Sequence, residues 1–459
     1  MANDNTTQSD PNTWFKTLMT ALAAVFAGVL GYLLWQIARY SQRLWRQPRF
    51  IYDLPISEAT SPEELQAISL MITAANVRSA IEKRLLLNGE EKWVLCAGIR
   101  NFREPWARDF SFASYGLMEM EEALVVKEGL EVFFTYQRPD GQFPVKVHST
   151  SIADRYLHSL FRRQQPITAP IKPKYTTAHN TISLDGNGLL VIAALNYVEC
   201  SDDHDFGQAH WPALKQAVAW MESHAVISNG LLRQGPYSDW ADSIARRGRI
   251  LYTNVIYWKA LHELAQAVRR YGDRHEHELY TAKADHVCRA IQDHFWREER
   301  GYFITSHRHQ KLSSASNLMA IAWDLATTEQ AHSILDTMEI FGLADPIPTQ
   351  VTHRAYPSHY VGLENRLAGI IHYHSRAAWL WIGAWHVIAL ARVQRVEEAN
   401  VLLNRIDETI ARDGVVHEVY GPAGHHLSTR WYTSEAPLTW SAAMVIYAHH
   451  VLGRHDLLY

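Results

Sequence analysis

Apolar and polar positions follow each other at helical spacing through most of this 459-residue chain. The first long example starts at Ser61-Pro62-Glu63-Glu64, a capping box with proline in the first turn, and continues through Leu87. The same pattern predicts helices near residues 109–136, 185–199, 207–226, 254–271, 276–296, 315–341, 372–394, 396–411 and 435–452. Strand-like runs are few and short. The pattern therefore predicts an all-helical protein.

Turn signals separate these helices without dividing the chain into domains. They are Pro139-Asp140-Gly141, Asn229-Gly230 and Asp413-Gly414. No clean linker interrupts residues 60–459, and no glycine-rich phosphate loop follows a strand. One large domain of this kind is either a barrel of paired helices or an open solenoid. A solenoid has a fixed short sequence period, and none is present.

The N-terminal segment has a different pattern. Leu18–Ala38 contains 21 residues without a charge, about the length that crosses roughly 30 Å of hydrocarbon. A cleaved signal peptide is the alternative, but its apolar core spans only about 7–15 residues after a basic start. Here Asp4 and Asp10 precede the segment against one Lys16. We expect a tail over 1–17, a transmembrane anchor over 18–38 and a basic tether over 39–59.

Four arginines follow the apolar segment, at Arg39, Arg43, Arg46 and Arg49. Positive charge concentrates on the cytoplasmic side of membrane proteins. The pattern thus predicts an N-terminus outside the membrane and a large C-terminal domain in the cytoplasm.

Composition narrows the function. Lys plus Arg is 44 and Asp plus Glu is 48, and this near-neutral balance argues against nucleic acid as a partner. The three cysteines are too far apart for a zinc or redox motif, and the 25 histidines form no metal-binding motif: His262 to Gln266 misses the zincin pattern by its final residue. We therefore expect no metal and no cofactor. Polar-tipped aromatic rings are abundant, with 16 Trp and 21 Tyr against 14 Phe.

Some of these rings recur beside acids in loops that precede helices. Five such loops are Pro105–Phe110, Ser183–Gly186, Tyr237–Ser243, His417–Tyr420 and Trp431–Trp440. Each acid taken alone is explained as a helix cap. If the helices close into a ring, however, the loops at one end converge on one basin. Aromatic faces stack on sugar rings, and carboxylates and arginines hydrogen-bond to hydroxyls. Glycosidic cleavage needs one carboxylic acid and one further carboxylate.

These loops resemble those of the six-hairpin-barrel glycosidases, which include glucoamylases, debranching amylo-α-1,6-glucosidases and neutral invertases. Trp106-Ala107-Arg108-Asp109 is similar to the Trp-Thr-Arg-Asp segment of glucoamylases, and Leu184-Asp185-Gly186 lies where they have Arg-Asp-Gly-Pro. The segments Glu418–Tyr420, Leu427–Arg430 and Leu438–Ala442 resemble their general-base region. The resemblance covers roughly residues 60–459 and implies an (α/α)6 toroid, here behind a single transmembrane helix.

The resemblance also implies roles. Asp242 becomes the general acid, with Asp239 as its rival, and Glu418 becomes the general base, with Glu435 as a lesser rival that would otherwise cap the last helix. Inversion is expected, with carboxyl groups roughly 6.5–9.5 Å apart and an acid whose pKa is raised by burial and neighbouring carboxylates. The expected substrate-binding residues are Trp106, Arg108, Asp109, Asp185, Tyr237, Trp240, Tyr420, Arg430 and Trp440.

The substrate implied is a carbohydrate with an α-glucosidic bond. Neutral invertases share the spacing and a segment like Ala245–Gly248, but they carry His-Asn-Gly-Gly where this chain has His372–Arg376, which argues against sucrose. His372 and His417 are expected near the basin. An alternative of a different class is an inactive, membrane-tethered barrel that binds glycans.

Overall fold

Six helices form a closed inner ring in the computed structural model, which describes residues 11–47, 61–151, 157–158, 161, 163–167, 169–224 and 229–456. They are α3 (Ala107–Glu119), α6 (Asp185–Ser201), α8 (Leu251–Tyr271), α10 (Ser314–Ala322), α13 (Leu380–Arg392) and α15 (Thr439–Asp456). Each packs against the next in this order, and α15 packs against α3. Most residues of α6 and α13 are buried, as expected of helices with protein on every side.

A second layer of helices surrounds this ring. Its members are α2 (Pro62–Arg78), α4 (Ala123–Thr135), α7 (His204–Glu222), α9 (Arg274–Phe295), α11 (Thr328–Ile340) and α14 (Val396–Asp413). These helices are amphipathic: α14, for example, buries Ala399, Leu402, Ile406 and Ile410 at helical spacing. Inner and outer helices alternate along the chain, so the inner helices run parallel and all begin at one end of the ring.

Strands form only small pairs in the described chain. β1 (Ile81–Leu85) pairs with β2 (Glu91–Leu95), β3 (Lys146–His148) with β4 (Lys172–Lys174), and β5 (Trp296–Arg297) with β6 (Tyr302–Phe303), all antiparallel. Short helical turns complete the fold: η1 (Glu298–Arg300), η2 (Ser358–Tyr360) and α12 (Leu363–Leu367). The six-hairpin architecture expected from the sequence is confirmed, with three small two-stranded sheets added to it.

Several predicted helices have different boundaries. The first ends at Arg78 rather than Leu87, and the chain continues into β1. The segments 109–136 and 315–341 each form two helices, interrupted where Glu121 (φ 61°) and Asp324 (φ 63°) adopt left-handed backbone. An unbroken helix of about 28 residues would be about 42 Å long. The chain instead turns back after each inner helix, which keeps the two layers in register.

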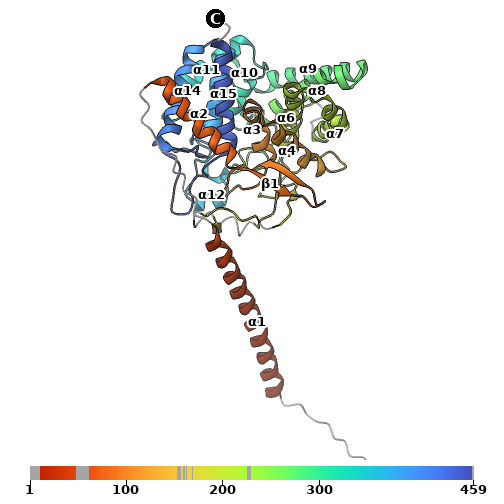
Figure 1. The fold of residues 1–459 in the computed structure, drawn as a ribbon, viewed down its shortest axis with the longest axis vertical. Coiled ribbons are helices and arrows are strands. Elements are labelled where there is room, and N and C mark those ends of the chain that lie inside the picture. The colour runs from red at the N-terminus through yellow and green to blue at the C-terminus, as the bar shows by residue number, and fades with distance from the viewer. Residues whose placement is uncertain are drawn as a thin grey trace, which may run out of the picture.

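The helix α1 (Pro11–Arg46) projects from the end of the domain that carries α12 and β1, while the C-terminus lies at the opposite end (Figure 1). By length and composition α1 suffices to cross a membrane, a test that an N-terminal signal sequence also passes. Its helix continues through Arg39, Arg43 and Arg46, whereas residues 1–10 and Arg49 lie outside the described residues.

The last turn of α1 contacts the domain. Trp45 lies 6.1 Å from the ring of Phe161, between centroids, and the Arg163 guanidinium lies over the Trp45 ring at 5.0 Å. Arg163 also donates a hydrogen bond to the carbonyl of Gln47 at 2.5 Å, and Leu44 is buried. These contacts hold the end of α1 against the domain.

Candidate active site

A cavity of about 100 Å³ lies where the inner helices begin. It is lined by Phe102, Trp106, Arg108, Asp109, Trp240, Asp242, Tyr373, His374, Trp379, Glu418, Leu438 and Trp440. These residues come from the first turns of α3 and α15, from the residue before α13 and from the loops between them. Ring closure thus brings both ends of the domain sequence to one cavity.

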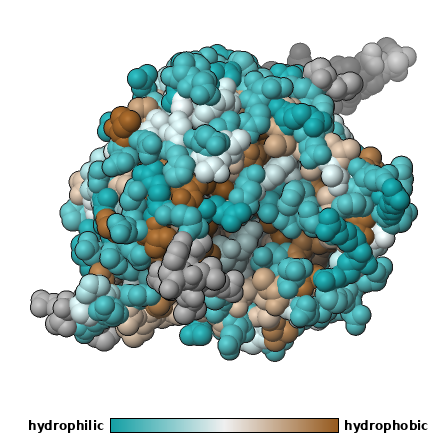
Figure 2. All heavy atoms as spheres, turned by 90° about the horizontal axis from the view of Figure 1, so that it is seen from above, coloured by the Kyte–Doolittle hydropathy of each residue, from teal (hydrophilic) through white to brown (hydrophobic). Residues whose placement is uncertain are grey.

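A larger hollow of about 840 Å³ lies where the inner helices end. Seen from that end, apolar side chains show in the hollowed centre of a mostly hydrophilic face (Figure 2). Its acids are Glu263, which pairs with Lys259 at 2.5 Å, and the exposed Glu199, which lies 3.8 Å from Arg270. The smaller cavity differs because its carboxylates are surrounded by protein.

Asp242 is partly buried at the wall of the small cavity. Burial raises the pKa of this carboxyl to about 7, and the negative charges of Asp239, Asp185 and Glu418 act in the same direction against the opposing charge of Arg108. A carboxyl group with that pKa is partly protonated at neutral pH. It can therefore donate a proton.

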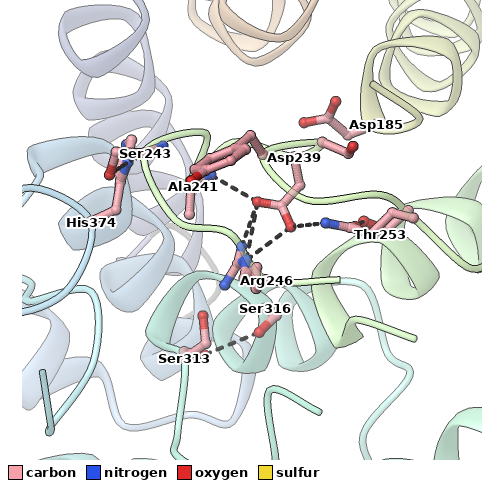
Figure 3. A network of polar contacts seen from close by, with 12 residues as sticks. Asp185, Asp239, Ala241, Ser243, Arg246, Thr253, Ser313, Ser316 and His374 are labelled. Atoms are coloured by element: carbon pink, nitrogen blue, oxygen red, sulfur yellow. Dashed lines mark hydrogen bonds and ion pairs between the residues drawn. The ribbon is translucent and has the colours of Figure 1, made fainter. Parts of the chain in front are cut away.

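Asp239, the rival acid, is fully buried and is absent from the cavity lining. Its carboxylate accepts hydrogen bonds from Arg246 at 2.7 and 2.9 Å, from Gln234 at 2.6 Å and from the Ala241 amide at 2.9 Å (Figure 3). Both of its oxygens are occupied by these partners. Asp239 fixes the loop that carries Asp242.

Glu418 is buried and faces the same cavity. Its carboxylate accepts hydrogen bonds from the hydroxyls of Tyr373 and Tyr432, the latter at 2.6 Å, and from the Glu435 amide at 3.0 Å. Burial raises the pKa of Glu418, and these hydrogen bonds oppose that rise because they stabilise the ionised form. The three donors also fix the orientation of the carboxylate.

Glu435, the rival base, is fully buried and does not line the cavity. Its carboxylate accepts the backbone amides of Ile99, Arg100 and Asn101 at 3.1, 2.7 and 2.7 Å. The Arg100 guanidinium lies 3.6 Å away. The carboxylate thus binds the 99–101 loop, near the start of the domain sequence, rather than capping the last helix.

Arg108 and Asp109 line the cavity beside Asp242. Arg108 donates to Asp185 at 2.7 Å, and Asp185 in turn accepts from Ser183 at 2.5 Å and from the Gly186 amide at 2.9 Å. Burial raises the pKa of Asp109 to about 7. Asp185 does not line the cavity, and its contact with Arg108 fixes the position of the guanidinium that does.

Three further residues predicted to bind substrate lie elsewhere. Tyr237 stacks on His179 with centroids 3.9 Å apart, and Arg430 is exposed with its guanidinium over Trp431 at 5.0 Å. Tyr420 is buried, and its hydroxyl accepts the His417 amide at 3.3 Å. None of these three side chains lines the cavity, so sequence proximity to an acid did not place them there.

Five cavity residues were not predicted: Phe102, Tyr373, His374, Trp379 and Leu438. His374 stacks on Trp379 and lies 2.8 Å from the Ser243 hydroxyl, and burial holds its pKa well below the usual value. In the sequence, the segment 372–376 was notable for its departure from invertases and for His372, which was expected near the basin. The expected His372 and His417 do not line the cavity.

Aromatic donors surround the acids. The indole nitrogens of Trp106, Trp240 and Trp440 are buried without a hydrogen-bond partner in the protein, and all three residues line the cavity. A buried unpaired donor costs free energy unless a ligand or water accepts from it. The cavity thus combines ionisable carboxyls, one arginine and unpaired N–H donors, which suits a polyhydroxylated ligand.

Within the described ranges, no three His, Cys, Asp or Glu side chains are grouped so that they could hold a metal ion.

Part of the chain matches a known protein family. Residues 127–340 match the family model of the bacterial alpha-L-rhamnosidase six-hairpin glycosidase domain. No curated protein matches the chain.

Solved structures share the fold at low identity. A rhamnosidase from Klebsiella oxytoca with rhamnose bound superposes with a TM-score of 0.62 at 14% identity, over 86% of this chain and 64% of that protein. The chain therefore spans less than two thirds of that relative's length. The mannosylglycerate hydrolase of family GH63 from Thermus thermophilus gives 0.59 at 14% identity, over 83% and 99%. A variant of a protein described as a glycosidase gives 0.60 at 15%, over 86% and 99%.

Proposed function

We propose that this chain is a glycoside hydrolase of the six-hairpin superfamily, with Asp242 as its general acid and Glu418 as its general base. The observation that supports these roles is their convergence. Two carboxyl groups from distant loops line one small cavity, while Asp239 and Glu435 do not line it and bind neighbouring parts of the protein through both oxygens.

The reaction follows from the two environments. Asp242, protonated, gives its proton to the glycosidic oxygen as the bond from that oxygen to the anomeric carbon breaks. Glu418, ionised, removes a proton from a water whose oxygen bonds to the anomeric carbon on the opposite face. These two steps together invert the anomeric configuration. They need carboxyl groups roughly 6.5–9.5 Å apart, which leaves room for the water.

Substrate recognition is assigned to the other cavity residues. Arg108 and Asp109 would bind the hydroxyls of the sugar, while Trp106 and Trp440 supply apolar faces and N–H donors. The cavity is smaller than the roughly 300–1,000 Å³ clefts that bind drug-sized ligands. A single terminal sugar ring fits this size better than a chain that passes through.

The favoured substrate is an α-glucoside, on the resemblance of the Trp106–Asp109 and Glu418–Ala442 segments to glucoamylases. An α-L-rhamnoside is the second candidate, because the matched family model is that of a rhamnosidase domain. The test is hydrolysis by the full chain in detergent of maltose, isomaltose, trehalose, sucrose, glucosylglycerate, mannosylglycerate and p-nitrophenyl α-L-rhamnoside. Sucrose turnover would support the invertase alternative, and tight glycan binding without any turnover would support the inactive barrel.

The catalytic assignment is tested with Glu418→Gln and Asp242→Asn, which should each abolish turnover of natural glycosides while the protein stays folded. The anomer first released, read by proton NMR, should be inverted. Retention would contradict the role of Glu418 as a base acting on water.

We further propose that α1 anchors the enzyme in a membrane, with the N-terminus outside and the catalytic domain in the cytoplasm. Its apolar length and the arginines that follow it support this topology. The full chain should stay in the membrane pellet after an alkaline carbonate wash, with its original N-terminus intact by mass spectrometry. A shortened, soluble product would identify a signal peptide instead.

A further inference from the structure

A patch of large apolar side chains is exposed on and around α12. We call it the α12 patch and define it by Leu363, Leu367, Ile371 and Trp431. Leu363 and Leu367 are 58% and 71% exposed and lie four residues apart, which places them on the same face of α12. Trp431 is 62% exposed. Neighbouring exposed apolar residues of this size mark an interaction surface.

The patch is one continuous surface although two segments form it. The Thr429 hydroxyl donates to the Ala368 carbonyl at 2.7 Å, and the Trp431 amide donates to the same hydroxyl at 3.2 Å. These bonds join the loop that carries Trp431 to the end of α12. The patch thus has a fixed shape.

Its charge is mainly positive. Arg366, Arg376 and Arg430 are exposed around it, and none is ion-paired within the part of the chain that the structure describes. Glu364 is the acid on α12, and it lies 3.1 Å from His179. Arginine, leucine and tryptophan side by side are typical of surfaces that lie on anionic bilayers.

The patch lies at the end of the domain from which α1 projects (Figure 1). If the apolar span ends at Ala38, the contact of Trp45 with the domain is within about 12 Å of the hydrocarbon edge along the helix. The headgroup layer on each side is about 5–8 Å thick. A domain held this close brings protruding side chains into the interface. The opposite end of the domain is mostly hydrophilic at its rim (Figure 2).

The patch is also joined to the catalytic base. Ile371 precedes Tyr373 by two residues, and Trp431 directly precedes Tyr432. The hydroxyls of both tyrosines donate to Glu418. A surface bound at the patch is therefore next to the cavity.

We propose that the α12 patch rests on the anionic leaflet of the membrane that α1 spans, and that the enzyme acts on glycosides whose aglycone is a lipid held in that leaflet. The sugar would enter the cavity while its lipid stays in the bilayer. This inference rests on the proposed glycosidase activity and anchor, and the two experiments below separate its failure from theirs.

The first experiment measures membrane contact without activity. In a chain carrying Cys200→Ser and Cys288→Ser, Leu363→Cys is labelled with bimane and the full protein is placed in nanodiscs of phosphatidylcholine and phosphatidylserine. Brominated lipid should quench this label severalfold more than a label at Val401→Cys. Val401 is a matched control because it is exposed to a similar extent, 62% against 58% for Leu363, on the outer helix α14. Equal quenching at the two positions would overturn the contact.

The second experiment measures the substrate class. The glycone found with the soluble panel is supplied as a dodecyl glycoside in the same nanodiscs and as a soluble p-nitrophenyl glycoside. The variant Leu363→Asp/Leu367→Asp should lose tenfold or more in kcat/KM on the dodecyl glycoside and less than twofold on the soluble one, with unchanged Tm. Equal losses on both, or none on the dodecyl glycoside, would refute a lipid-linked substrate. Strong quenching with no turnover of any glycoside would instead contradict the glycosidase mechanism while supporting the membrane contact.

Discussion

Asp242 and Asp239 are three residues apart in one loop, and we expect substitution of each to impair the enzyme in a different way. Asp242→Asn removes a proton donor but keeps the size and hydrogen bonding of the side chain. General acid catalysis contributes about 10²–10⁴ in rate. With a sugar or alcohol as leaving group we expect a loss of kcat of that size. With p-nitrophenol, which leaves without protonation, the loss should be much smaller.

Asp239→Asn leaves the guanidinium of Arg246 buried without its carboxylate partner. Removing one member of a buried ion pair costs about 3–5 kcal/mol of stability. We therefore expect a lower Tm and a loss of activity that does not depend on the leaving group, because the loop that carries Asp242 is loosened.

The pH profile gives an independent reading of the same assignment. The acid must be protonated to act, and burial raises the pKa of Asp242 to about 7. The rate of the wild-type enzyme should fall about tenfold for each pH unit above 7, and so about 100-fold by pH 9. Burial raises the pKa of Asp109 to the same value, so the fall in rate above pH 7 reports the titration of Asp242 and Asp109 together.

The assay combines kcat, kcat/KM between pH 5 and 9, and thermal unfolding for both variants on a natural glycoside and its p-nitrophenyl analogue. The reasoning is refuted if Asp239→Asn keeps the wild-type Tm and shows the leaving-group dependence, while Asp242→Asn does not. That outcome would transfer the acid role to Asp239.

Three further predictions test the surrounding structure. Tyr373→Phe removes a hydrogen bond that favours ionised Glu418, so the pKa of Glu418 should rise and the acidic limb of kcat/KM should move to higher pH, whereas an unmoved limb would contradict the contact. Glu435→Gln should lower Tm strongly, since its carboxylate binds three amides and faces Arg100, and a stable but inactive variant would reopen its candidacy as the base. Gly116→Ala should cost about 1–3 kcal/mol, because a Cβ there would lie 2.0 Å from the Ala443 carbonyl oxygen where α3 and α15 cross. Gly453→Ala on α15, where a Cβ meets nothing within 4 Å, is the control and should not destabilise.

Helical periodicity predicted the fold class because burial of one face is a local requirement that each segment meets by its own spacing. It failed where the chain had to turn back. Residues 109–136 have the spacing of one helix, yet the two-layer ring places a reversal at Glu121. The hairpin of β1 and β2 was also missed. Lys92 and the Trp93 amide contact α4, and such tertiary contacts are not visible in the local spacing of apolar residues.

The sequence by itself determined which residue types could act as acid, base and sugar ligands, because the loops that combine acids with aromatic residues can be recognised in it. Only the tertiary structure decided which carboxylates line the cavity. Asp239 and Asp242 look alike in sequence, as do Glu418 and Glu435. Asp239 and Glu435 bind Arg246 and the amides of 99–101 outside the cavity, whereas Asp242 and Glu418 line it. The availability of a carboxylate depends on partners hundreds of residues away in the case of Glu435, and no local pattern contains that information.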